Sequence, residues 1–246
     1  MTAETTIAPT PCPAQVQPAP ATESPPSSAS PSFPTPKLRI EIDDLNDSGT
    51  AVFLSHISLP ADFNTAVATV LRHLYLSPTC RAYHTPSIGA VTLHLRAFDG
   101  VAYTTGPAAH KEIHLSTSYI TARAPHVDIA HEIRGVLTHE LVHVFQHNGK
   151  GKCPGGFIEG VADWVRLKAG LQPPHWTKHG DCDWDAGYER TGYFLEFLEG
   201  KFGPEIVRKM NERLTAEWDG EELFFMALCG KTVGELWDEY KQSLSS

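Results

Sequence analysis

The sequence lacks a surplus of basic residues. Its 246 residues include 20 Lys and Arg against 29 Asp and Glu, which gives a formal net charge of −9 at pH 7. Proteins that bind nucleic acids or anionic membranes through charge present a basic face, because phosphates attract Lys and Arg. We therefore expect no nucleic-acid partner.

The sequence also lacks long apolar runs and paired cysteines. No apolar run approaches the roughly 18 residues of a membrane-spanning helix, so we expect no membrane partner. The segment Met1–Thr6 carries neither the basic nor the apolar stretch of a secretory signal. This predicts an intracellular, cytoplasmic protein, or a secreted one if a signal was removed or export is unconventional. The five cysteines form no CxxC pair, which favours free thiols.

Residues 1–37 differ in composition from the rest of the chain. Pro, Ala, Ser and Thr dominate this segment, which holds 10 of the 19 prolines. Such a composition buries too little apolar surface to offset the entropy lost when a backbone becomes ordered. The sequence therefore predicts a disordered tail over residues 1–37 and one folded domain over residues 38–246.

Hydrophobic periodicity in the domain predicts strands first and helices later. Alternation of apolar and polar residues predicts strands at 38–42, 91–96, 101–103 and 113–116, with a hairpin turn at Asp99-Gly100. Helical spacing predicts one helix that begins after an Asp128 cap and ends at Asn148-Gly149. It predicts further helices over residues 61–75, 157–169, 186–199, 204–218, 221–229 and 233–244. This order predicts an α+β fold, with a small N-terminal mixed sheet packed on a mainly helical C-terminal half.

The chemistry is concentrated in the segment HELVH at residues 139–143. His139 and His143 lie four residues apart on a predicted helix, so their imidazoles project from one face and can share one Zn²⁺. Glu140 points about 100° around the helix from His139, where a general base for an activated water belongs. The segment on its own is also compatible with an exposed His beside a helix-stabilising Glu.

A catalytic zinc needs a third protein ligand. In the metzincin pattern a Gly and a third His follow at fixed spacing, but here Gln146 and Gly149 occupy those places. Glu159, on the next predicted helix, follows a turn-rich linker that can reverse the chain, and we expect it to be the third ligand. Asp163 lies on the same face of that helix. We expect its carboxylate to accept the free N–H of His139, which orients the ligand.

Two blocks of the sequence resemble a known family. Residues 135–149, GVLTHELVHVFQHNG, and residues 154–170, PGGFIEGVADWVRLKAG, are similar to the core of the basic secretory proteins of plants and microbes. Residues 100–103, 112–116 and 184–188 match as well, and the resemblance spans about residues 38–244. It implies a zinc metallopeptidase with a zincin (gluzincin)-like fold that acts on peptides or proteins. In plants the family is linked to defence, whereas this chain is acidic.

Two further parts of an active site remain to be assigned. For the donor to the oxyanion of the substrate, Tyr188 is the first candidate, and His179 and Tyr193 are the alternatives. A strand at residues 100–104 or at 113–116 is expected to pair with the substrate backbone. The leading hypothesis is a zinc metallopeptidase with Glu140 as general base. The alternative is a non-catalytic, zinc-stabilised interaction module that recruits partners through its Pro-rich tail.

Overall fold

The structure, a computed structural model, describes residues 33–245. The predicted disordered tail covers residues 1–37, and residues 1–32 of it lie outside the described residues. The strands are β1 (Lys37–Ile42), β2 (Ala90–Arg96), β3 (Ala102–Thr105) and β4 (His110–Ser116). The helices are α1 (Ser48–His56), α2 (Ala61–Tyr75), α3 (Thr117–Arg123), α4 (Ile129–Phe145), α5 (Gly155–Lys168), α6 (Tyr188–Phe202), α7 (Ile206–Arg213), α8 (Glu221–Cys229) and α9 (Val233–Leu244).

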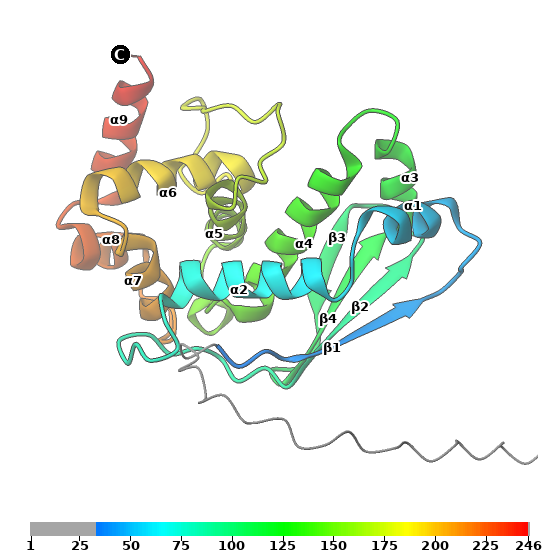
Figure 1. Cartoon of the computed structure of the whole chain (residues 1–246). Helices are drawn as coiled ribbons and strands as arrows, with labels where there is room; N and C mark the ends of the chain where they lie inside the picture. The colour runs from blue at the N-terminus through cyan, green and yellow to red at the C-terminus, as the bar shows by residue number, and fades with distance from the viewer. Residues whose placement is uncertain (1–32, 246) are drawn as a thin grey trace, which may run out of the picture. The chain divides into compact units, whose positions relative to one another are not determined.

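The four strands form one mixed sheet in the order β1-β2-β4-β3 (Figure 1). Strands β1, β2 and β4 are parallel, and β3 is antiparallel to β4 at the edge. The predicted hairpin at Asp99-Gly100 is wrong, because β3 pairs with β4 and not with β2. A turn signal specifies a local reversal of the chain, whereas packing against the core decides which strands become neighbours.

One face of the sheet is apolar and lies against helices, as Figure 1 shows for α2 and α4. Val91, Leu93 and Leu95 of β2 are at most 1% exposed, as are Ile113 and Leu115 of β4. Because side chains alternate between the faces of a strand, the residues between them point the other way. That opposite face carries polar residues, among them His94 and His114.

Helices α5 to α9 make up the C-terminal half, so the predicted α+β class is confirmed. Helices α5 and α6 approach closely at Gly160, where a Cβ atom would lie 2.2 Å from Thr191 Cγ2. Helix α6 begins at Tyr188 rather than at the predicted residue 186, because Gly187 adopts a left-handed φ of 90°. Helix α7 is shorter than predicted, and the short helices α1 and α3 were not predicted.

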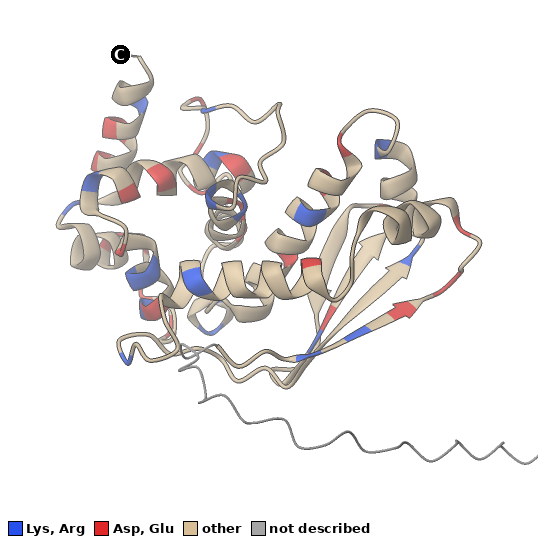
Figure 2. Cartoon of the chain, viewed as in Figure 1, with Lys and Arg blue, Asp and Glu red and all other residues tan. Residues whose placement is uncertain are grey.

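Acidic and basic residues are interspersed over the helices and strands of the described chain (Figure 2). This distribution agrees with the absence of a basic surplus in the composition. None of the helices that the structure describes has the length and apolar character needed to cross a bilayer.

Candidate metal centre

Helix α4 positions the HELVH segment. The helix begins after Asp128, whose side chain accepts a hydrogen bond from the backbone N–H of His131 at 3.1 Å. It ends after Phe145, where Gln146 adopts an extended ψ of 152°. Within it, the four-residue spacing places His139 and His143 on one face, with their Nε2 atoms 3.1 Å apart.

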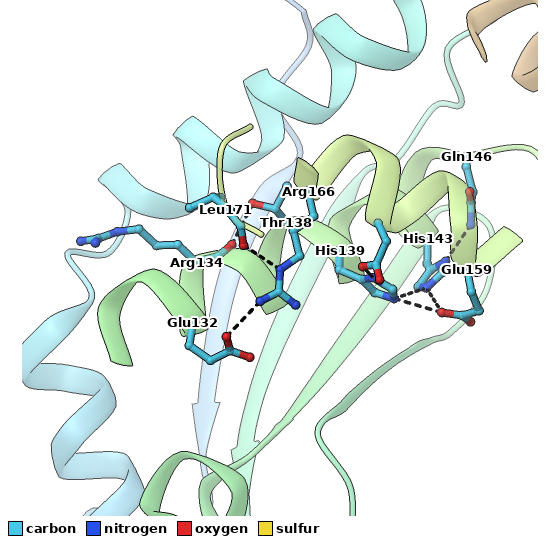
Figure 3. A network of polar contacts seen from close by, with 10 residues as sticks. Glu132, Arg134, Thr138, His139, His143, Gln146, Glu159, Arg166 and Leu171 are labelled. Atoms are coloured by element: carbon cyan, nitrogen blue, oxygen red, sulfur yellow. Dashed lines mark hydrogen bonds and ion pairs between the residues drawn. The ribbon is translucent and has the colours of Figure 1, made fainter. Parts of the chain in front are cut away.

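Helix α5 brings the third predicted ligand to these two imidazoles. The chain turns between the helices through the 3₁₀ segment Gly149–Gly151, where Lys150 adopts a left-handed φ of 57°. Glu159 Oε2 then lies 3.0 Å from His139 Nε2 and 3.4 Å from His143 Nε2 (Figure 3). Three donors from two helices thus converge on one point.

The donor set fits zinc. Tetrahedral coordination with bonds of about 2.0–2.1 Å places the ligand atoms about 3.3 Å from one another. The three separations between His139, His143 and Glu159 are 3.0, 3.1 and 3.4 Å. Two imidazoles and one carboxylate are also the ligands of many catalytic zinc sites that keep one position open.

Asp163 contacts the Nδ1 atom of His139, as its position in the sequence predicted. Its Oδ1 lies 2.6 Å from His139 Nδ1, and the residue is 3% exposed. Burial by itself would lower the pKa of His139, but the hydrogen bonds to Asp163 and Glu159 raise it to about 10. Burial would raise the pKa of Glu159, yet its contacts with His139 and His143 hold it well below its usual range. The carboxylates around His139 therefore favour a positive charge at this position, which suits a cation.

Gln146 supports His143, and sequence reasoning missed this contact. Its Nε2 atom lies 2.7 Å from His143 Nδ1 (Figure 3), while its Oε1 atom is buried without a hydrogen-bond partner. Rotating the amide by half a turn would let Oε1 accept the Nδ1 proton of His143. That hydrogen bond leaves the Nε2 lone pair free for a metal, as expected of a ligating imidazole. The orphaned oxygen is thus a second observation that fits a metal.

Thr104 of β3 contacts Glu140. The Thr104 hydroxyl lies 2.7 Å from Glu140 Oε2 and 3.0 Å from the backbone oxygen of Glu140. Glu140 is only 5% exposed, so one carboxylate oxygen is held by the hydroxyl and the other remains for a ligand. No local pattern in the sequence linked these residues, because 36 positions separate them.

The site lies in a cleft of about 820 Å³. Strand β3, helices α4 and α5 and the start of α6 line it, through residues that include Thr104, His139, Glu140, Glu159 and Tyr188. Of the two strands predicted to pair with a substrate, β3 is at the sheet edge and lines the cleft. Strand β4 has neighbours on both sides, so its backbone is already paired.

The family model of BSP, described as a peptidase of plants and bacteria, matches residues 35–240. The chain belongs to the BSP family. This confirms the resemblance to the basic secretory proteins, and the description makes peptides or proteins the substrate class of the family. No curated protein and no solved structure matches the chain.

Of the candidate oxyanion donors in this BSP-family chain, Tyr188 lines the cleft. Its ring lies nearly parallel to that of His139, with 6.1 Å between centroids and 14° between planes. The negative charge of Glu159 raises the pKa of Tyr188, so the Tyr188 hydroxyl stays protonated and can donate a hydrogen bond. His179 and Tyr193 are absent from the cleft lining. His179 contacts Thr177, and Tyr193 lies beneath Lys178.

A buried ion pair lines the cleft in this family member. Arg166 of α5 donates to Glu132 of α4 at 3.0 Å and to the backbone oxygen of Leu171 at 2.9 Å (Figure 3). Tyr119 donates to the other oxygen of Glu132 at 2.7 Å. Gly135 leaves room for this arrangement, because a Cβ there would lie 2.5 Å from Arg166 Nε. The pair fixes α4 to α5, and thus His139 and His143 to Glu159.

Proposed function

We propose that this chain is a zinc-dependent peptidase, with His139, His143 and Glu159 as zinc ligands and Glu140 as general base. The observation that carries the proposal is the convergence of three donor atoms at 3.0–3.4 Å beside a buried carboxylate. The family description supports peptide-bond hydrolysis as the reaction.

When bound, zinc would supply a Lewis acid that lowers the pKa of a water molecule to about 7. Thr104 holds Oε2 of Glu140, which leaves Oε1 to accept a proton from the water that attacks the substrate carbonyl. The same carboxyl group can then give this proton to the departing amine. The hydroxyl of Tyr188 donates a hydrogen bond to the oxyanion that develops on the substrate.

Strand β3 orients the substrate. Its backbone pairs with β4 on one side only, and β4 is its only strand neighbour among the described residues. The free N–H and C=O groups of an edge strand pair readily with an extended peptide. Because Thr104 of this strand contacts Glu140, a peptide paired with β3 runs beside the general base.

The test replaces Glu140 by Gln, which keeps the size of the side chain but cannot accept the proton. We expect the variant to bind as much zinc per chain as the wild type, measured by elemental analysis. Cleavage of a peptide library should fall about 10²- to 10⁴-fold in the variant, the usual contribution of a general base. Glu189→Gln is a matched control, because Glu189 lines the same cleft and contacts none of the proposed ligands.

Full activity in Glu140→Gln would overturn the proposed role of Glu140. A wild-type protein that binds zinc but cleaves no peptide of the library would overturn the peptidase proposal, and would favour a zinc-stabilised interaction module instead.

A further inference from the structure

We propose that the polar face of the sheet holds a second site for a divalent transition cation of the zinc type, formed by His94, Glu112 and His114 and supported by Glu41. This site lies on the side of the sheet opposite the helices. It does not depend on the proposed peptidase function, because none of these four residues lines the cleft.

The site is built on strand register. Glu41 of β1 is paired with His94 of β2, His94 with His114 of β4, and His114 with Tyr103 of β3. These four residues therefore form a row across the whole sheet on one face. The rings of His94 and His114 stack at 4.5 Å with 8° between planes, and Tyr103 stacks on His114 at 4.6 Å.

Glu112 brings a carboxylate to both imidazoles. It precedes His114 by two positions on β4 and so shares its face. Its Oε2 atom lies 3.4 Å from His114 Nε2 and 4.0 Å from His94 Nε2, and the three donor atoms lie within 4.8 Å of one another. Two imidazoles and a carboxylate form a donor set suited to zinc, nickel and copper.

The donors must move closer for a cation to bind. A tetrahedral zinc needs its ligands about 3.3 Å apart. The His94 and His114 side chains are 17% and 12% exposed and stacked, so bringing their donors closer requires these partly buried rings to tilt. We therefore expect weaker binding here than at His139, His143 and Glu159, whose donors are already at the required separations.

Glu41 prepares His94 for a cation. Its Oε2 atom lies 3.3 Å from His94 Nδ1, within reach of a proton on that nitrogen, and the Nδ1 tautomer leaves a lone pair on Nε2. Without a cation, that lone pair faces the negative carboxylate of Glu112. A cation between the two groups turns this repulsion into two bonds.

Arg96 opposes binding at His114. Its Nε–H donates to His114 Nδ1 at 3.1 Å, which keeps the ring proton on Nε2, the atom that a metal would need. Arg96 also contacts the Tyr103 hydroxyl, so it has a second partner when it leaves His114. The geometry thus makes Arg96 a competitor of the cation. Replacing Arg96 by Gln removes the positive charge and supplies an oxygen that can accept the Nδ1 proton.

The experiment measures zinc bound per chain by equilibrium dialysis and elemental analysis, with the full chain and no affinity tag. We expect two zinc ions in the wild type and one in His94→Gln and in His114→Gln. The control His126→Gln, which changes an exposed His outside the cluster, should keep two. His143→Gln should lose the tighter ion and keep the weaker one, which distinguishes the two sites.

The first zinc that His94→Gln and His114→Gln retain also reports that these variants are folded. Arg96→Gln should bind the second zinc more tightly than the wild type. Glu41→Gln should bind it about two- to fivefold more weakly, because Glu41 is 66% exposed and its charge is screened by solvent. The proposal is wrong if the wild type binds no zinc, or if it binds a single zinc that His94→Gln retains or His143→Gln loses. A single zinc that is lost in His94→Gln and retained in His143→Gln would still support it. A second zinc that persists in both His94→Gln and His114→Gln would overturn it as well.

Discussion

Replacing Asp163 by Asn should weaken zinc binding roughly tenfold. The Asp163 carboxylate accepts the Nδ1 proton of His139 at 2.6 Å, and both side chains are at most 10% exposed. Asn can still accept this proton through its amide oxygen, so the substitution removes the charge and keeps the hydrogen bond. A hydrogen bond to a charged group contributes about 1.5–3 kcal/mol against about 0.5–1.5 kcal/mol for a neutral one. The difference of about 1–1.5 kcal/mol corresponds to roughly tenfold in affinity.

Asp163→Ala removes the hydrogen bond as well and should approach the upper limit of about 100-fold for a partner of a metal ligand. The assay is competition for zinc between each variant and a chromophoric chelator at neutral pH. Glu189→Gln again serves as the control, since it removes a negative charge from the same cleft without touching His139. The reasoning is refuted if Asp163→Asn binds zinc within twofold of the wild type, or if Glu189→Gln loses as much affinity.

Three further predictions concern the same site. The pKa of His139 in the metal-free fold is raised to about 10 from 6.5, so its contribution to stability is complete below about pH 6.5 and is lost as the pH rises through about 10. Urea titrations of the chelated protein should show this loss, and Asp163→Asn should reduce it. Thr104→Val should lower kcat/KM about 10- to 100-fold with zinc retained, because a hydrogen bond to the charged Glu140 is lost, while Thr104→Ser should preserve activity. Gln146→Leu should weaken zinc binding about 10- to 100-fold, and equal affinity in the chelator assay would rule out its contact with His143.

Local patterns predicted the elements that carry the ligands. The Asp128 cap and the 3.6-residue period located α4, and the turn-rich linker followed by a second apolar period located α5. The spacing of His139 and His143 is a property of one helix, so it could be derived without tertiary information, whereas the approach of Glu159 was inferred from the chain reversal between the two helices. Helix α3 was not predicted because its 7 residues are too few to establish a period. Helix α1 was not predicted because it buries only Gly49, Thr50 and Phe53, which do not form an apolar stripe.

Contacts between distant segments could not be derived in this way. The wrong hairpin at Asp99-Gly100 has this cause, since β4 enters the sheet between β2 and β3 only when the apolar faces are packed. Thr104 meets Glu140 for the same reason, because β3 becomes the edge beside α4. The stacked pair His94 and His114 likewise depends on strand register, which alternation within each strand leaves open.

The two histidine clusters differ in what prepares their imidazoles for a metal. At the first, one helix fixes the separation of His139 and His143, and both Nδ1 atoms have partners that can accept a proton. At the second, two strands hold the rings, and only His94 has such a partner, whereas Arg96 donates to the Nδ1 atom of His114. Preorganised ligands cost less free energy to assemble, so zinc should fill the first cluster before the second. Arg96→Gln gives the second cluster its missing acceptor, and it is therefore the single change that should bring the two affinities closest together.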